Sequence, residues 1–396
     1  MKKIFNILIV SIFIGGFLSS CDNDDNNIPT LSAPVKIVSQ QTSFPAAAST
    51  GSIIVDATAP ISVTSSDQGW VSTSVEGNVI TINVEENPSL DGRSSTLTIT
   101  CGEAKSDISV IQAGVIFDLG GVVSIPSGND ATTFTYELKS NCSVNVNSDA
   151  DWIKVESTDE GLVVTLDANN SGHVRRGNVT YTAGSVEGSI PVVQADFADN
   201  IAGEYMFAYV NSTTGKINYF NSILKGTESN CSIDIPALGF SIPVTYDSKT
   251  ASIRISGGSF IGDYEQYKAH ITLWDIDEGY LSWSSTVSMD APFDYSEDED
   301  GTGITEADFQ DNGSFTGYTV SAIRFEAFTS MTLNSNTRVG SLLNMIYPFL
   351  MRIHSTPEAV TQTEKFQNRV SRLSKNAVSV ELSSLSPIVK DNLIAR

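Results

Sequence analysis

The acidic stretch at residues 274–278 has the residue types of a hydrolytic site. Asp275, Asp277 and Glu278 supply carboxylates, and hydrolysis of a glycosidic bond needs two carboxyl groups about 5 to 10 Å apart across the sugar. The same residues, followed by Gly279, also form a turn pattern between two apolar runs. We expect a turn and a chain without enzymatic activity, and we keep a glycoside hydrolase acting through these carboxylates as the alternative.

Motifs of other enzyme classes are missing from the sequence. It contains no Gly-x-Ser-x-Gly, His-Glu-x-x-His, Cys-x-x-Cys or phosphate-loop pattern. His173, His270 and His354 are far apart in the sequence, and we interpret them as surface or packing residues. Residues 274–278 loosely resemble the Glu-x-Asp-x-x-Glu strand of one jelly-roll glycosidase family, but Asp275 replaces the first Glu and Tyr280 stands at the last. We expect no cofactor.

The acidic loop near residue 300 is a weak candidate for a calcium site. Three aspartates contribute carboxylates: Asp294, Asp298 and Asp300. If Gly301 takes the glycine position of an EF-hand loop, Ser296 falls at the first ligand and Ala307 at the bidentate glutamate. Because the pattern fails at both positions, we expect a solvated acidic loop and no bound metal.

Five aromatic side chains near predicted hairpins are the candidate ligand-binding residues. They are Tyr264, Tyr267, Trp274, Tyr280 and Trp283. Flat aromatic faces stack on sugars, so an exposed group of this kind would form a carbohydrate platform. A buried group would be core, which is the more common place for large aromatic residues. The sequence leaves both interpretations open.

A β-domain at residues 197–349 must position these side chains. This stretch holds 23 of the 34 aromatic residues, and its apolar runs are separated by turn residues. The expected strands are 205–210, 216–220, 240–246, 251–256, 271–276, 280–287, 315–320 and 323–329. We predict an antiparallel barrel or sandwich. The start Gly203-Glu204-Tyr205 faintly resembles the Gly-x-Trp start of lipocalin-like barrels, with Tyr205 in place of Trp.

The last segment, residues 350–396, is predicted to be a partly helical tail. Thr356 before Pro357 is typical of a helix start, and Phe366, Val370 and Leu373 then lie on one helical face. The apolar residues just before it, at 342–350, fit either a helix or a buried strand.

The N-terminal half repeats itself at an offset of 82 residues. The matched pairs are Trp70 and Trp152, Asp67 and Asp149, Asn87 and Asn169, Arg93 and Arg175, and Gln112 and Gln194. The apolar positions between them alternate with period two in both copies, as strands with one buried face require. The repeat predicts two small β-sandwiches, at residues 33–114 and 115–196.

Both copies resemble the BACON domain (Bacteroidetes-associated carbohydrate-binding often N-terminal). In the second copy the resemblance rests on residues 149–155, 175–181 and 190–194, and in the first on 68–72, 93–99 and 108–112, where Gly69 replaces a usual acidic residue. The resemblance implies an immunoglobulin-like fold on surface lipoproteins of glycan-using bacteria, acting in carbohydrate binding or as a spacer. We favour a spacer because the two copies contain few aromatic residues.

The first 32 residues have the pattern of an exported and lipid-anchored chain. A basic start precedes an apolar run shorter than the roughly 20 residues of a membrane-spanning helix. Residues 18–21 resemble the bacterial lipoprotein box, which implies a signal peptide at 1–20 and lipidation of Cys21. The acidic residues 22–25 resemble the signal that sends some Gram-negative lipoproteins to the outer face of the outer membrane. We expect residues 21–32 to be a flexible tether.

The composition limits the partners. The 396 residues carry a net charge of −23, which disfavours nucleic acid and anionic lipid surfaces. Cys101, Cys142 and Cys231 fall in separate segments, so no disulfide framework is expected.

These patterns predict a surface lipoprotein of the outer membrane that faces the exterior. Two spacer domains would present a C-terminal β-domain that binds a ligand, with polysaccharide or glycoconjugate as the expected class. The alternatives are the glycoside hydrolase and a structural adhesin or assembly protein with surface partners and no small ligand.

Overall fold

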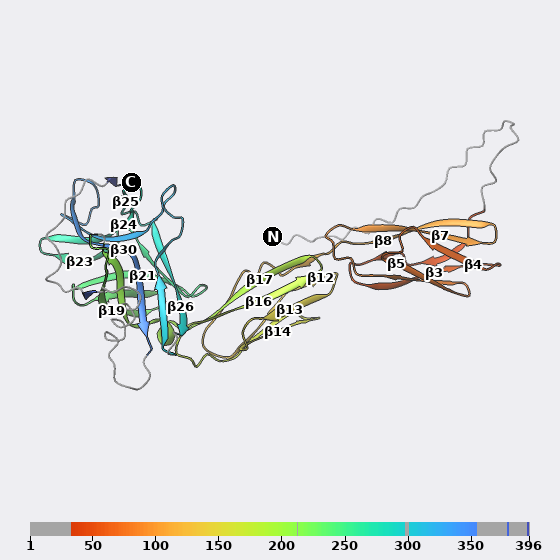
Figure 1. Cartoon of the computed structure of the whole chain (residues 1–396), viewed down its shortest axis with the longest axis horizontal. Helices are drawn as coiled ribbons and strands as arrows, with labels where there is room; N and C mark the ends of the chain where they lie inside the picture. The colour runs from red at the N-terminus through yellow and green to blue at the C-terminus, as the bar shows by residue number, and fades with distance from the viewer. Residues whose placement is uncertain (1–32, 212, 298–300, 355–377, 380–393, 396) are drawn as a thin grey trace, which may run out of the picture. The chain divides into compact units, whose positions relative to one another are not determined.

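The computed structural model describes residues 33–211, 213–297, 301–354, 378–379 and 394–395 (Figure 1). These residues form β-strands joined by turns, with one short π-helical turn, η1 (Phe197–Ile201). The predicted all-β class, with immunoglobulin-like sandwiches and a C-terminal antiparallel barrel, is confirmed. Within these ranges no helix has the length and apolarity that crossing a membrane requires. The signal peptide, Cys21, Asp298, Asp300 and the helix start at Thr356 lie outside the described residues.

The chain divides into two compact units. The described residues up to Ser43, with Ser49–Glu85 and Ser94–Ile111, form unit 1. Phe44–Ala48, Glu86–Arg93 and the chain from Gln112 onward form unit 2. Unit 2 therefore contains both the second sandwich and the C-terminal barrel.

The first sandwich contains two four-stranded sheets, with strand orders β1-β3-β6-β5 and β2-β8-β7-β4. The strands are β1 (Ile37–Gln40), β2 (Ser43–Phe44), β3 (Ser49–Val55), β4 (Ile61–Ser65), β5 (Val71–Glu76), β6 (Val79–Val84), β7 (Arg93–Cys101) and β8 (Ala104–Gln112). Ile80 and Ile82 of β6 are fully buried and the residues between them are not. This is the period-two pattern that the sequence predicts for a strand with one face on a core.

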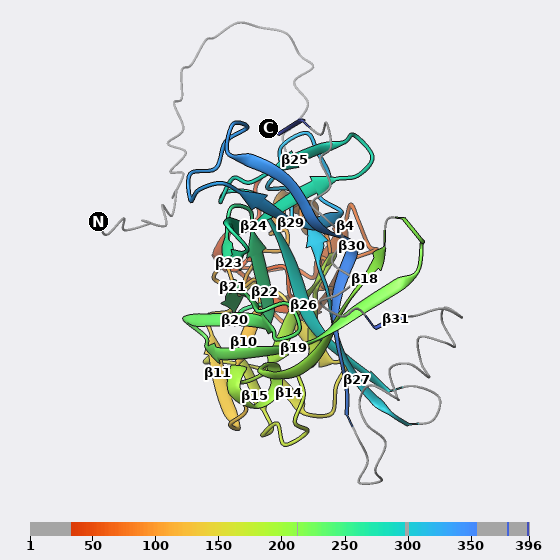
Figure 2. The same ribbon diagram turned by 90° about the vertical axis from the view of Figure 1, so that its left-hand side faces the viewer.

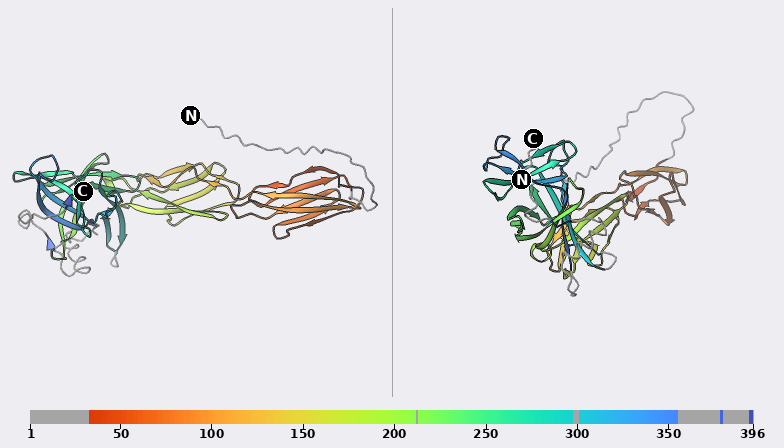
Figure 3. Two further views of the ribbon diagram at one scale, coloured as in Figure 1. Left: turned by 90° about the horizontal axis from the view of Figure 1, so that it is seen from above. Right: turned by 60° about the vertical axis from the view of Figure 1, so that its left-hand side comes forward.

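The second sandwich has the same plan, with strand orders β10-β17-β16-β13 and β11-β15-β14 and a short pair β12-β9. The strands are β9 (Phe117–Asp118), β10 (Ile125–Ser127), β11 (Thr132–Tyr136), β12 (Lys139–Ser140), β13 (Val144–Ser148), β14 (Ile153–Thr158), β15 (Gly161–Leu166), β16 (Arg175–Ala183) and β17 (Val186–Gln194). Leu162 and Val164 are fully buried, at the positions equivalent to Ile80 and Ile82. Figure 3 shows the strands of this sandwich, in yellow to green, side by side.

Polar residues that recur at the 82-residue offset make the same contacts in both sandwiches. The Arg93 Nε donates a hydrogen bond to the Gln112 Oε1 at 2.8 Å. The Arg175 Nε donates to the Gln194 Oε1, also at 2.8 Å. Both glutamines are fully buried, and a buried amide is costly unless it is hydrogen-bonded. The repeated arginine therefore supports a buried polar group at the end of each sandwich.

The two repeated tryptophans differ in their surroundings. Trp70 is 6% exposed, and its indole N–H donates to the Asp67 carboxylate at 2.9 Å. Trp152 is partly buried, with the Arg175 guanidinium carbon 4.3 Å from its ring centroid. Asp149, the equivalent of Asp67, is instead hydrogen-bonded to β16. In the second sandwich the tryptophan is therefore contacted by Arg175 at the face of its ring and not through its indole nitrogen.

The C-terminal domain is an eight-stranded antiparallel barrel (Figure 2). Its strands in spatial order are β18 (Gly203–Asn211), β19 (Ile217–Thr227), β20 (Asn230–Ile235), β21 (Phe240–Asp247), β22 (Ser252–Ser256), β26 (Ser288–Glu297), β27 (Gly303–Asp308) and β30 (Arg338–Ile353). Antiparallel pairing of β30 with β18 closes the ring. Closure removes the free edges that an open sheet would present.

Strand β30 is long enough to take part both in the barrel and in a smaller sheet beside it. Its C-terminal part pairs with β18 and β27 to close the barrel, and its N-terminal part pairs with β29 (Ala322–Phe328). Strand β29 pairs with β24 (Tyr267–Asp275), which also pairs with β23 (Phe260–Tyr264) and β25 (Tyr280–Ser282). Tyr347 marks the change of partner, since its φ of 48° is in the left-handed region and the β18–β30 register shifts beside it.

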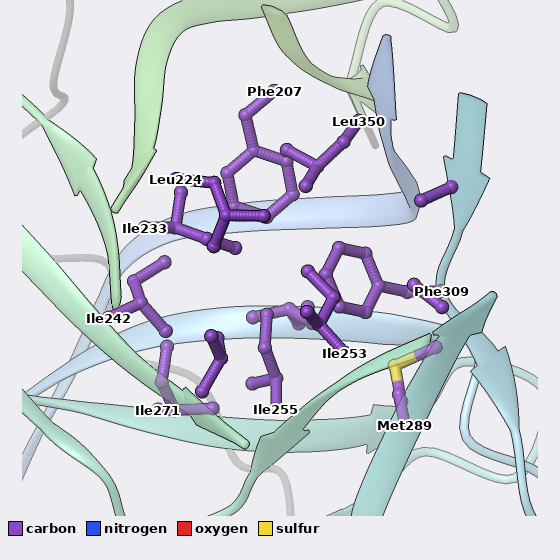
Figure 4. Close-up of a cluster of buried hydrophobic side chains, with 14 of the residues drawn as sticks. Phe207, Leu224, Ile233, Ile242, Ile253, Ile255, Ile271, Met289, Phe309 and Leu350 are labelled. Carbon is purple, nitrogen blue, oxygen red and sulfur yellow. The ribbon is translucent and has the colours of Figure 1, made fainter. Parts of the chain in front are cut away.

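The barrel interior is filled by apolar side chains. Figure 4 shows Phe207, Ile233, Ile255 and Leu350 of four strands, and Phe309 just after β27, pointing toward one another. All of them are at most 5% exposed. The interior is a packed core, as is usual for small barrels, which leaves the outer surface of the domain for ligand binding.

A second apolar cluster lies on the outer face of the barrel. It contains Met206, Ala208, Tyr219, Ile304, Met351 and Ile353. On β18 these positions alternate with Phe207, which points into the interior. All six are at most 2% exposed, although they face away from the barrel core.

The second sandwich and the barrel share one core. Val174, Val193 and Ala195 of the sandwich belong to the same buried cluster as the barrel interior. The Arg176 guanidinium donates to the Phe293 carbonyl at 2.6 and 3.0 Å and to the Thr250 carbonyl at 2.7 Å. Burial lowers the pKa of Arg176, but the nearby Asp294 opposes the effect.

Two strand predictions in the barrel domain are wrong in whole or in part. Residues 315–320 form a turn, because Gly317 has a φ of 84°. Only 280–282 of the expected strand 280–287 is a strand, and β26 follows it unpredicted. Of the two alternatives for residues 342–350, the strand is the one observed, since these residues belong to β30.

Candidate functional site

The five candidate aromatic residues do not form one exposed surface. All are partly buried. Tyr264 and Tyr267 are cross-strand partners on the β23–β24 hairpin, and both pack against the barrel core. Tyr280 lies edge-on to Tyr318, with ring centroids 4.8 Å apart. The structure therefore places these three rings mainly in packing contacts.

The two tryptophans of this set make separate contacts. The ring of Trp283 lies edge-on to Phe328, at a centroid distance of 5.7 Å. Trp274 lies 5.0 Å from the Arg324 guanidinium carbon, and its indole nitrogen is shielded from solvent. That nitrogen cannot reach a ligand in this structure.

The acidic stretch at 275–278 forms a hairpin turn. Asp275 is 3% exposed, and its Oδ1 accepts the backbone N–H groups of Asp277 and Glu278 at 3.0 and 3.1 Å. Its Oδ2 accepts the Thr319 N–H at 2.9 Å. Both oxygens are thus used to hold two loops, whereas Asp277 and Glu278 are exposed. This arrangement favours the turn interpretation over a pair of carboxylates facing a sugar.

A buried ion pair on β29 was missed in the sequence. Arg324 and Glu326 are fully buried although they lie in a strand with buried apolar neighbours. The Arg338 Nε donates to the Glu326 Oε1 at 3.0 Å, which satisfies the carboxylate from the next strand. The sequence signal for this ion pair was two opposite charges two residues apart in an apolar run. Residues at i and i+2 lie on the same face of a strand, so such charges can pair. Since the ion pair is closed off from solvent, it supports structure here.

Two histidines that are distant in the sequence come together in unit 2. The ring of His173 stacks on Tyr295 with a centroid distance of 3.3 Å, and His354 lies edge-on to both rings. The His354 Nε2 is 2.7 Å from the Thr305 hydroxyl. Burial lowers the pKa of His354 to about 4, and it lowers that of His173 as well. Both rings are therefore neutral packing groups at pH 7, as the sequence interpretation allows.

The weak calcium candidate gains no support from the described residues. The Asp294 Oδ1 accepts the Tyr295 N–H at 2.9 Å, and its two proposed partners lie outside the described ranges. Among the residues that the structure describes, no group of three or more His, Cys, Asp or Glu side chains is arranged to hold a metal ion.

A polar groove lies on the outer face of the barrel, over β21, β22 and β26. Its volume is about 320 Å³, at the lower end of the range of ligand pockets. Its lining residues are Thr245, Tyr246, Asp247, Ser248, Lys249, Ser252, Arg254 and Asp290. Sequence reasoning missed it, because the residues come from three strands and only their register brings them together.

The second sandwich also carries a depression, of about 420 Å³, over β13 and β14. Its lining residues are Val146, Asn147, Ser148, Asp149, Ala150, Asp151, Ile153 and Val155. The lining contains no aromatic ring, and Asp149 is engaged with Asn178 at 2.8 Å. This hydrogen bond lowers the pKa of Asp149, so the carboxylate serves the local fold.

The family comparison agrees with the repeat. The BACON family model, described as "Putative binding domain, N-terminal", matches the chain twice, at residues 60–113 and 143–195. A comparison with curated proteins finds no match.

Solved structures similar to this chain include three of different kinds. A protein from Bacteroides thetaiotaomicron is 15% identical with a TM-score of 0.20, over 24% of this chain and 98% of that chain. A three-domain titin fragment is 9% identical with a TM-score of 0.24, over 71% of this chain and 94% of the fragment. An endo-fucoidan hydrolase from glycoside hydrolase family 107 is 11% identical with a TM-score of 0.23, over 43% of this chain and only 30% of the enzyme. These values are too low to carry a function across, whereas the family matches stand on their own. The chain contains two BACON domains in tandem.

Proposed function

We propose that this chain is a cell-surface lipoprotein in which the two BACON domains act as a spacer and the barrel binds glycan. The observation that carries the proposal is the pair of tandem BACON matches ahead of a structurally different barrel. Cys21 would carry the lipid, and its acidic neighbours would direct the chain to the outer face of the outer membrane.

The spacer role is supported by the contents of the two sandwiches. Trp70 is buried in the first core, and the second has Trp152 and Tyr181 packed against its core. Sugar recognition depends on exposed ring faces joined to a few polar groups. The aromatic residues of the BACON domains are used in packing, which supports the spacer role, and the ligand is assigned to the barrel because of its polar groove.

A binding role is favoured over hydrolysis by the state of the acidic turn. Asp275 is buried and saturated by backbone N–H groups. General acid or nucleophilic work needs a carboxyl group that can reach the glycosidic bond. The two other carboxylates are on an exposed turn with no partner carboxylate held opposite them by a described contact.

The test uses a soluble form of the full mature chain, which begins at residue 21 and carries the change Cys21→Ser. We expect binding to one or more polysaccharides on a glycan array and no release of reducing sugar from those that bind. Turnover would establish the hydrolase alternative. Binding to no glycan, together with capture of a surface protein by purified chain, would favour the adhesin or assembly role.

The surface location has its own test. Replacing Asp22, Asp24 and Asp25 by Ala should protect the barrel from protease added to whole cells. Equal cleavage of the parent and variant proteins would mean that the acidic residues are only a tether.

A further inference from the structure

We propose that the polar groove over β21, β22 and β26 is a subsite for a neutral sugar unit, bound through its hydroxyl groups. The inference rests on the proposed function and names a place and a ligand class for it. The groove is lined by two cationic side chains, Lys249 and Arg254, and two anionic ones, Asp247 and Asp290.

The strand register builds the groove from alternate residues. Thr245 is opposite Arg254 on β21 and β22, and Arg254 is opposite Asp290 on β26. Because side chains alternate across a strand, these three share the outer face. Ile253 and Ile255 point inward and are fully buried. The polar side chains therefore stand on a rigid floor whose other face is the barrel core.

One ion pair fixes the centre of the groove. The Arg254 Nε donates to the Asp290 Oδ1 at 2.6 Å, and its Nη2 donates to the Oδ2 at 2.7 Å. This bidentate geometry holds the guanidinium in one plane. The Nη1 hydrogens are left for a ligand, and the side chain is 50% exposed. The hydrogen bonds that Arg254 donates to Asp290 raise the pKa of Arg254 and lower the pKa of Asp290, so both are charged at pH 7.

The turn at one end of the groove adds a second donor and acceptor. The Asp247 Oδ1 accepts the Lys249 N–H at 2.9 Å, which orients the carboxylate and leaves its other oxygen toward solvent. The hydroxyls of Ser252 and Thr250 are 2.7 Å apart and fix each other. A sugar hydroxyl both donates and accepts, so it can bridge a carboxylate and a guanidinium. Vicinal hydroxyls can do so twice.

The charge balance selects among glycans. The two cations and two anions of the lining cancel, while the whole chain carries −23. A sulfated or uronic acid chain would meet long-range repulsion without a local excess of positive charge. A neutral polysaccharide is not repelled by the net negative charge of the chain, and it needs no excess of positive charge in the groove.

The experiment compares the full mature chain with two groove variants and a matched control. Arg254→Met and Lys249→Met each remove one cationic group at an exposed position, so melting temperatures should stay close to that of the parent. Arg254→Met should weaken binding of the best neutral glycan on the array about tenfold, since a hydrogen bond to a charged group is lost. Lys225→Met removes a lysine that pairs with Asp234 elsewhere on the barrel, and its affinity should match the parent.

The outcomes separate the two proposals. If the parent binds a neutral glycan and both groove variants keep that affinity, the subsite is wrong and the glycan-binding function stands. If the parent binds acidic glycans only, the ligand class is wrong. If the parent binds no glycan, both proposals fail.

Discussion

Truncation of the repeated tryptophans should destabilise the two BACON domains unequally. Trp70→Ala removes a side chain that is 6% exposed, and such a change costs about 3–5 kcal/mol. It also leaves the Asp67 carboxylate without its indole donor, a loss of about 1 kcal/mol. Trp152 is partly buried and its Asp149 neighbour is bonded elsewhere. We therefore expect Trp152→Ala to cost about 1 kcal/mol less, although a contact with Arg175 is lost as well.

Hydrogen exchange resolved by peptide is the appropriate assay, because the two sandwiches melt in one chain. Peptides covering β6 report on the first domain and peptides covering β15 on the second. Each variant should lower protection mainly in its own domain. Val75→Ala, at a position 40% exposed on β5, is the control and should change stability by less than about 0.5 kcal/mol. The reasoning would be refuted if Trp152→Ala cost as much as or more than Trp70→Ala.

Three further outcomes are expected. Cys21→Ser should move the chain from the detergent to the aqueous phase, whereas Cys101→Ser should not; unchanged partitioning of the first variant would exclude lipidation. Because burial lowers the pKa of His354 to about 4, the unfolded chain binds a proton at His354 more tightly than the folded chain, so the free energy of unfolding should fall as the pH drops from about 6.5 towards 4. His354→Asn should reduce this fall, measured by urea titrations at pH 7 and 5. An equal difference between the two pH values in parent and variant would contradict the argument. A chain that ends at His354 lacks β31 (Val378–Ser379), which pairs with β19 at Tyr219; it should expose more of the outer apolar cluster and bind more hydrophobic dye than the full chain, and equal dye binding would show that β31 does not shield the cluster.

The BACON domains were predictable because their signals are local and repeated. Period-two burial in β6 and β15 follows directly from the apolar pattern. The polar positions shared by the copies also have a physical role in each. The Asn87 side chain donates to the Asp91 and Ala113 carbonyls, and Asn169 donates to the His173 carbonyl in the same way. The asparagine recurs with the loop because its side chain forms the hydrogen bonds that hold the loop in each copy.

The barrel was predictable as a class but not in its details. Phe315 and its neighbours look like a strand because aromatic and β-branched residues are frequent there, yet the Asp275 carboxylate accepts the Thr319 N–H and holds this segment in a turn. The groove depends on which strands are adjacent, and β22 pairs with β26 across an intervening stretch of the chain. The sequence alone carries no information on that pairing. The stack of His173 on Tyr295 is missed for the same reason.

The shared core between the second BACON domain and the barrel has a consequence for capture of a ligand. Turning the barrel against this domain would break the Arg176 bonds to the Phe293 and Thr250 carbonyls and open a continuous apolar interior. The pair therefore rotates as one particle that contains about one and a half times as many residues as the barrel alone. Because this particle rotates more slowly, one face of the barrel stays turned toward a stationary polymer for longer. A barrel that cannot rotate independently of its neighbouring domain also loses less rotational entropy when it binds.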